Sequence, residues 1–308
     1  MPELFGVALT RADIERRCGA LDQFAGVRLM TLGDGLERGI RMLEFRSGTG
    51  LRFTVLVDRA MDIADCDFQG AAIGWHSPSG FRHPGLHEPE GEGGLGWLRS
   101  FSGLLVTCGL DHILFMDERD ATSFIYTPRQ KVHNSIHGRI SAIPARLLGY
   151  GERWEGDRCF LWCDGIVSQG TVFGEHLELR RRIEIEVGTN TIKLHDVITN
   201  RGFYATPHMF CYHINLGYPL LDAGTEYVAP IACSRRAASW MSRTNPHTRA
   251  PEASKVLTSA LPSPPAAPVT RIRFPCNLNI DISLFSVGGH IHSLPWRLSL
   301  VRLQPLHR

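Results

Sequence analysis

The sequence predicts an all-β protein whose antiparallel strands form a sandwich or a barrel. First, apolar and polar residues alternate with a period of two in several long segments. Second, turn-forming residues such as glycine, aspartate and asparagine separate these segments. Third, only one segment carries the residues that begin a helix. Many strands with very few helices favour a sandwich or barrel over a sheet of βαβ units.

The single helix and the strands can be placed by residue number. Residues 10–18 predict a short helix, in which Thr10 is the N-cap and Asp13 follows three residues later. Strands are expected at residues 39–48, 51–68, 158–170, 176–188 and 191–200. The turns include Gly33-Asp34-Gly35, Gly156-Asp157 and Gly188-Thr189-Asn190, and the last of these joins the clearest hairpin in the sequence.

Residues 74–103 interrupt the alternation. This stretch is rich in glycine, proline, histidine and tryptophan, and it has little strand periodicity. A long loop inside a compact domain is usually functional or disordered, and the aromatic content argues against disorder. We therefore expect an ordered loop that covers a binding face.

Two smaller patterns have plain structural interpretations. The run Arg180-Arg181-Arg182 is interpreted as a solvated strand edge, which discourages edge-to-edge pairing. Cys159 and Cys163 fall on one face of a strand, and their spacing is not that of a CxxC pair.

Composition excludes several classes of partner. The 308 residues include 33 basic and 31 acidic ones, and a net charge of +2 does not predict binding to nucleic acid or to an anionic membrane. No run of apolar residues is long enough to predict a membrane span. The first residues lack the pattern of a secretory signal, so a cytoplasmic location with free cysteine thiols is expected.

The chain divides by composition into two unequal parts. Residues 1–252 are predicted to form one β domain without internal repeats. Residues 253–308 form an atypical C-terminal segment, in which Asp281 is the only acidic residue. This segment is interpreted either as a disordered tail or as an altered or truncated end of the same domain.

Histidines in strand and turn contexts are the candidate functional residues. His137 precedes Gly138 in NSIHGRIS, whereas His208 and His213 lie in the apolar stretch 206–224. An odd step separates His208 from His213, so their side chains should face opposite ways on an unbroken strand. The expected companions are Cys211 and Asn215 on the face of His213, and Phe210 and Tyr212 on the face of His208.

Five motifs in order carry a resemblance to a known family. They are VLVDRAMDIADCDFQG followed by IGWHSP, then GWLRSFSGLLVTCGLDH, HGRISAIPA, LELRRRIEIEVG and YHINLGYPLL. Together they resemble the aldose 1-epimerase (galactose mutarotase)-like superfamily, in a subgroup of largely undefined function, over roughly residues 25–230. The resemblance implies a galactose mutarotase-like β-supersandwich of antiparallel sheets. It also implies a site for a monosaccharide or sugar derivative on the concave face, without a cofactor.

The resemblance also implies roles for individual residues. Interconverting sugar anomers needs a base for the anomeric hydroxyl and an acid for the ring oxygen. Carried over by position, His213 is the general acid, and His137 binds and polarises the sugar. The further candidates for substrate binding are Arg59, Arg139, Trp75, Trp97, His208 and Glu175.

One departure from the family concerns the general base. The family places a glutamate near the C-terminus in a Gly-Leu-Glu-Pro-like context, whereas this chain has Leu303-Gln304-Pro305 and no glutamate after Glu252. A neutral amide cannot remove a proton. Either the C-terminal end is altered, or another carboxylate serves, or the chain binds sugar without turning it over. The possible substitutes are Glu175, Asp222 and Glu226.

A metal-dependent sugar isomerase is the third alternative. His83, His87, Glu88 and Glu92 supply ligand types suited to zinc or manganese. Four ligands on one loop would need an ordering that the sequence does not show, so no metal is expected.

Overall fold

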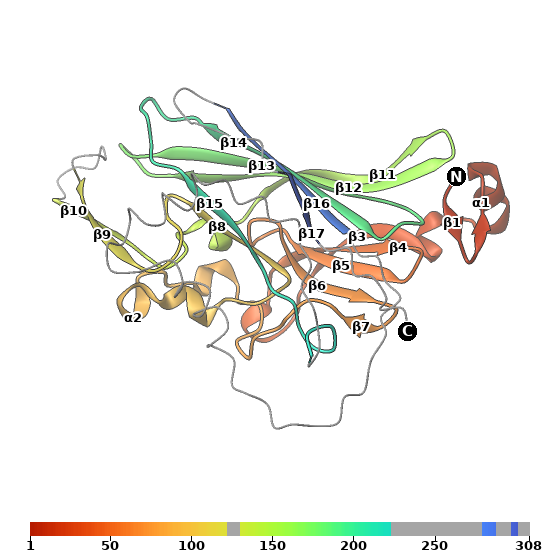
Figure 1. Ribbon diagram of the computed structural model, residues 1–308, viewed down its shortest axis with the longest axis horizontal. Helices are drawn as coiled ribbons and strands as arrows, with labels where there is room; N and C mark the ends of the chain where they lie inside the picture. The colour runs from red at the N-terminus through yellow and green to blue at the C-terminus, as the bar shows by residue number, and fades with distance from the viewer. Residues whose placement is uncertain (122–129, 223–278, 288–296, 301–308) are drawn as a thin grey trace, which may run out of the picture.

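The computed structural model describes residues 1–121, 130–222, 279–287 and 297–300, and it shows two large β-sheets packed face to face (Figure 1). The seven-stranded sheet has the order β15 (Met209–Ile214), β8 (Leu105–Leu110), β6 (Asp62–Phe68), β5 (Leu51–Leu56), β4 (Arg41–Ser47) and β3 (Ala25–Thr31), with β7 (Ala71–Ala72) paired to β6. The six-stranded sheet has the order β11 (Arg146–Glu155), β12 (Arg158–Gly170), β13 (His176–Glu186), β14 (Thr191–Asn200), β16 (Asn279–Val287) and β17 (Arg297–Leu300).

Neighbouring strands in both sheets pair in the antiparallel direction, with one exception. β14 and β16 are parallel. Two small hairpins complete the β structure, β1 (Glu3–Leu4) with β2 (Val7–Ala8) and β9 (Asp117–Asp120) with β10 (Lys131–Asn134). The two α-helices in the part of the chain that is described are α1 (Arg11–Arg17) and the single turn α2 (Gly91–Gly94). None of the helices described here has the length and apolar character needed to cross a membrane. The all-β prediction is confirmed.

Local signals in the sequence produced the predicted elements. The hydroxyl of Thr10 accepts from the N–H of Asp13 at 3.1 Å, and the Asp13 carboxylate accepts from the N–H of Thr10 at 3.0 Å. This capping box begins α1 where the sequence predicts a helix. Strands β13 and β14 form the predicted hairpin around Gly188, whose φ of +85° suits glycine.

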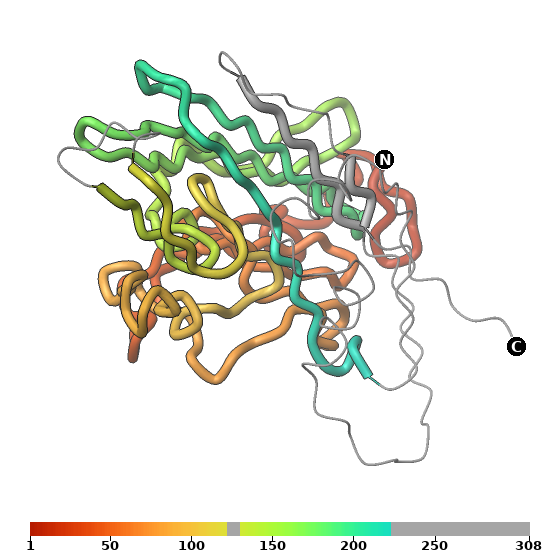
Figure 2. Tube along the Cα trace, turned by 60° about the vertical axis from the view of Figure 1, so that its left-hand side comes forward, coloured from red at the N-terminus to blue at the C-terminus, as the bar shows by residue number. Residues whose placement is uncertain are grey.

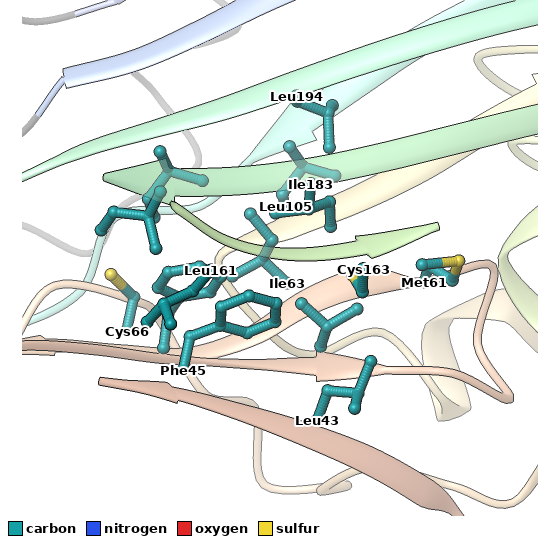
Figure 3. Close-up of a cluster of buried hydrophobic side chains, with 14 of the residues drawn as sticks. Leu43, Phe45, Met61, Ile63, Cys66, Leu105, Leu161, Cys163, Ile183 and Leu194 are labelled. Carbon is teal, nitrogen blue, oxygen red and sulfur yellow. The ribbon is translucent and has the colours of Figure 1, made fainter. Parts of the chain in front are cut away.

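The core lies between the two sheets. Buried side chains of β12, β13 and β14, such as Leu161, Ile183 and Leu194, face those of the seven-stranded sheet, such as Phe45 and Ile63 (Figure 3). Cys159 and Cys163 both belong to this core, as expected for residues on one strand face. Each of the six cysteines in the described ranges is a free thiol.

The interpretation of the arginine run as a strand edge is wrong. β13 lies between β12 and β14, and strand alternation turns Arg181 inward, where its side chain is 0% exposed. Arg181 donates to both carboxylate oxygens of Asp196, at 2.9 and 2.7 Å, and to Asp62 at 3.1 Å. Tyr212 donates to the same Asp196 at 2.7 Å. This buried cluster joins the two sheets, since Arg181 and Asp196 lie in the six-stranded sheet and Asp62 lies in the seven-stranded sheet. The charges can be buried because each is paired with an opposite charge.

The two ends of the sandwich differ. α1 lies at one end, and residues 74–103, drawn in orange to yellow, lie toward the other (Figure 2).

In the C-terminal part, β16 and β17 extend the six-stranded sheet, and the other residues of 253–308 lie outside the described ranges. The division into residues 1–252 and 253–308 therefore stays a prediction.

Candidate functional site

The fold brings His137 and His213 together. Their ring centroids lie 5.6 Å apart, and the rings meet edge to face at 89°. His213 belongs to β15, whereas His137 lies in the turn between β10 and the short 3₁₀ helix at Ile140–Ala142. Both side chains are half-buried, so the pair borders solvent. Two imidazoles from distant parts of the chain thus form one candidate site.

The face assignments on β15 are confirmed. Cys211 packs against the small cluster of Trp97 and its neighbours, on the side of His213, whereas Phe210 and Tyr212 pack against the main core. His208 contacts the carbonyl oxygen of Leu110 through Nδ1 at 3.2 Å. Alternation therefore separates His208 from the histidine pair.

His137 is held by backbone contacts on three sides. Its N–H donates to Leu114 O at 2.9 Å, and its carbonyl accepts from Gly109 N–H at 2.9 Å. Its Nδ1 accepts from the N–H of Leu114 at 3.3 Å. Because Nδ1 accepts, the proton of the neutral ring resides on Nε2, which is then a donor. His137 has a φ of +59°, a value that residues other than glycine rarely adopt, and the next residue, Gly138, has a φ of +70°.

His213 has the opposite hydrogen-bonding capacity. Its Nδ1 lies 2.6 Å from Oδ1 of Asn215. The Asn215 amide nitrogen donates to Gly103 O at 2.9 Å, which orients Oδ1 toward the ring and makes Nδ1 of His213 the donor. Nε2 of the neutral His213 ring is consequently an acceptor.

Both histidines are neutral near pH 7. Burial lowers the pKa of His137 to about 4, and the neighbouring His213 and His112 add to the shift. Burial also lowers the pKa of His213, against the hydrogen bond to Asn215, which favours the protonated ring. The pair therefore offers one N–H donor and one lone pair.

An aromatic layer supports the imidazoles. Trp97 is 2% exposed, and its ring centroid lies 4.2 Å from that of Phe101 and 4.6 Å from that of His137. Phe101 lies 4.9 Å from His213 and 5.2 Å from the half-buried Trp75. Trp97 thus packs beneath the histidine pair, and little of its surface is available to stack on a sugar. The loop expected over a binding face supplies all three aromatic rings.

Arg139 and Glu175 form an ion pair beside His137. Arg139 donates through Nε to Asp111 at 2.9 Å and through a terminal nitrogen to Glu175. The Glu175 side chain is only 3% exposed, and it also accepts from the Thr171 hydroxyl at 3.0 Å. Glu175 therefore holds Arg139 in place, and Arg139 with a side chain 38% exposed remains reachable from solvent.

Arg59 is not an exposed anchor. It is 4% exposed, and it donates to the carbonyl oxygens of Ser141 at 2.7 Å, Arg82 at 3.0 Å and Ser100 at 3.1 Å. These bonds tie the segment that follows His137 to residues 74–103. Its role in this arrangement is to position the loops around the site.

The remaining candidate bases and metal ligands are described only in part. Asp222 is exposed, whereas Glu226 and Gln304 fall outside the described residues. Glu88 and Glu92 both pair with Arg99, while His83 accepts from the N–H of Gly85. Among the residues described, no group of three or more histidine, cysteine or acidic side chains could hold a metal ion.

Phe101 and Asp111 belong to the site but were not predicted from the sequence. Phe101 contacts His213, and Asp111 fixes Arg139. The signal for Phe101 is its place in the aromatic segment 74–103, but nothing in that segment distinguishes Phe101 from the other aromatic residues. Nothing in the local pattern around Asp111 marks it as a partner of Arg139.

Comparisons with known proteins identify a family and a fold. A family model described as a domain of unknown function (DUF4432) matches residues 37–259. A solved structure of a candidate aldose 1-epimerase from Klebsiella pneumoniae is 26% identical, with a TM-score of 0.58, over 67% of this chain and 51% of the other. This chain thus spans about half the length of that protein. A galactose mutarotase-like protein from Clostridium acetobutylicum is 10% identical, with a TM-score of 0.43, over 65% of this chain and 56% of the other.

No curated protein matches the sequence. The family model covers well over half of the chain, and the Klebsiella structure shares the β-sandwich described above. The chain belongs to the DUF4432 family, and it has the galactose mutarotase-like fold of the aldose 1-epimerase-like superfamily.

Proposed function

We propose that this chain binds a monosaccharide or sugar derivative at the histidine pair and interconverts its anomers or epimers without a cofactor. One observation carries the proposal: two neutral imidazoles meet 5.6 Å apart, with a donor Nε2 on His137 and an acceptor Nε2 on His213. The acceptor can take the proton of a sugar's anomeric hydroxyl, and the donor can form a hydrogen bond to the sugar's ring oxygen. Arg139 supplies further donors beside the pair.

In the proposed reaction, His213 Nε2 removes the proton of the anomeric hydroxyl. The electron pair of that O–H bond forms the carbonyl, and the bond from the anomeric carbon to the ring oxygen breaks. The N–H of His137 stabilises the negative charge that develops on the ring oxygen, as a neutral imidazole can. His213, now protonated, gives its proton to that oxygen and completes ring opening. Closure on the other face of the carbonyl reverses these steps and yields the other anomer.

This assignment keeps His137 as the polarising residue and makes His213 the acid only after it has acted as base. A resting neutral His213 follows from its lowered pKa. Within the described ranges, neither imidazole is hydrogen-bonded to a carboxylate. The lack of such a carboxylate among the described residues favours the second candidate function, a carbohydrate-binding protein that does not interconvert anomers.

Exchange NMR on glucose, galactose, keto-sugars and uronic acids tests the proposal. We expect the wild-type chain to accelerate exchange for at least one sugar and His213→Ala to abolish the acceleration. His195→Ala, an exposed histidine on β14, is the matched control and should retain full activity. Unchanged rates in His213→Ala would refute the catalytic role. Saturable binding with no exchange in the wild type would instead favour the non-catalytic candidate.

A further inference from the structure

A cleft of about 390 Å³ lies beside β6 and β7, and neither His137 nor His213 lines it. Its walls include Arg52, Asp65, Asp67, Trp75, His76 and Tyr218. A volume of this order lies within the usual range for small-molecule sites. The cleft plays no part in the function proposed above.

A hydrogen-bonded dyad forms one wall of the cleft. His76 Nε2 lies 3.0 Å from Asp65 Oδ1, and Asp65 Oδ2 accepts from the Thr54 hydroxyl at 2.7 Å. The hydrogen bond to Asp65 raises the pKa of His76, and the charges of Asp65 and Glu37 add to the shift. The side chains of His76 and Asp65 are 50% and 35% exposed, so both can reach a ligand.

A second polar pair and two aromatic residues complete the lining. Arg52 donates to Asp67 at 3.1 Å, and Asp67 shares a face of β6 with Asp65, two residues away. Trp75 is half-buried, and Tyr218 is 70% exposed. Carboxylates accept from hydroxyl groups, and guanidinium and imidazole groups donate to them. Aromatic rings offer an apolar surface to the C–H face of a sugar.

The cleft is connected to the histidine pair through Trp75. The backbone N–H of Trp75 donates to the carbonyl oxygen of Asn215 at 3.1 Å, and the side chain of Asn215 orients the His213 ring. Trp75 and His213 also pack against the same ring, that of Phe101, at 5.2 and 4.9 Å. A ligand in the cleft would therefore contact a residue that supports the first site.

We propose that this cleft is a second carbohydrate-binding site, which takes one sugar ring. Asp65 and His76 bind its hydroxyl groups, while Trp75 and Tyr218 contact its apolar face. The site does not depend on His213, so the inference goes beyond the proposed function. It gives the chain two sugar sites, linked by the backbone bond between Trp75 and Asn215.

Calorimetric titration of glucose, galactose, fructose and glucuronate into the full-length chain tests the second site. In His213→Ala, we expect at least one of these sugars still to bind saturably. Adding Asp65→Asn or Tyr218→Ala should weaken that binding at least tenfold, whereas the exposed control Glu118→Gln should not change it. Tyr218→Ala keeps the test valid if Asp65→Asn perturbs folding, because the Tyr218 side chain is largely exposed.

Two results would overturn the second site. One is the absence of saturable binding by any of the four sugars in folded His213→Ala. The other is binding that neither cleft substitution weakens. Failure of the proposed function is a different result, because it consists of absent anomer exchange in the wild type and leaves binding to the cleft in place.

Discussion

The amide of Asn215 holds His213 in a single tautomer. Its Oδ1 accepts from Nδ1 of the ring at 2.6 Å, while its nitrogen donates to Gly103 O at 2.9 Å and to His213 O at 3.3 Å. Rotating the amide by half a turn would place two oxygens against each other at Gly103. The amide is therefore oriented by its donors, and the lone pair of His213 is directed to Nε2.

Replacing this amide should change the protonation of His213. In Asn215→Asp, a carboxylate would face Nδ1, and we expect it to raise the pKa of His213 because it favours the imidazolium form. NMR titration of the His213 ring measures this directly. Asn200→Asp, whose amide donates to Tyr204 O at 2.8 Å in another loop, is the control and should leave the His213 titration unchanged. An unshifted His213 in Asn215→Asp would contradict the assigned contact.

The depressed pKa of His137 predicts a pH dependence of stability. An unfolded histidine titrates near 6.5 and the folded His137 at about 4, so the unfolded state binds more protons between these values. Stability should fall as the pH drops from about 6.5 toward about 4, and the part due to His137 should then level off. Urea unfolding of the wild type and His137→Gln at several pH values isolates this part. The difference in unfolding free energy between the wild type and His137→Gln should shrink on acidification, and a difference that stays constant between about pH 6.5 and about 4 would contradict the lowered pKa of His137.

Removing Arg181 should destabilise the sandwich strongly. Arg181→Met leaves Asp196 and Asp62 buried without their cation, and breaking a buried pair typically costs about 3–5 kcal/mol. The neighbouring Arg180→Met is the matched control, because that side chain is 57% exposed in its pair with Asp164. Asp164 is buried but also lies 4.0 Å from Arg182, so the loss should be smaller than for Arg181, while fully exposed pairs contribute about 0–1 kcal/mol. Equal losses for the two variants, measured by denaturant unfolding, would show that the buried cluster is dispensable.

Gly138 should resist substitution because both its backbone conformation and its surroundings require glycine. It has a φ of +70°, and a Cβ there would lie 2.5 Å from Gly109 O and 2.7 Å from Asp111 Oδ1. Gly156 shares a positive φ, +59°, but a Cβ there meets nothing within 4 Å. Gly156→Ala should therefore cost only the backbone term, about 1 kcal/mol. Thermal unfolding should show a larger loss for Gly138→Ala, which should also impair sugar binding by displacing His137.

Much of the local structure follows from the sequence. The capping box at Thr10, the hairpin of β13 and β14, and the opposite faces of His208 and His213 are consequences of contacts between residues close in the chain. Strand alternation also implied that Arg181 faces the same side as Leu179 and Ile183. The charge of the whole run nevertheless suggested a solvated edge, because the partners that neutralise Arg181 come from other strands.

The sequence by itself determined the class of fold, several of its strands and the histidines on which a sugar site is proposed, although the predicted strand at residues 51–68 is two strands, β5 and β6. Only the tertiary structure decided which residues meet. Period two assigns a side chain to a face but does not say which strand will lie beside it, and the pairing of β15 with β8 brings His213 to the segment of His137. The same long-range packing buried Arg59 and Trp97 and opened the cleft beside Trp75, because burial depends on neighbours that are distant in the chain.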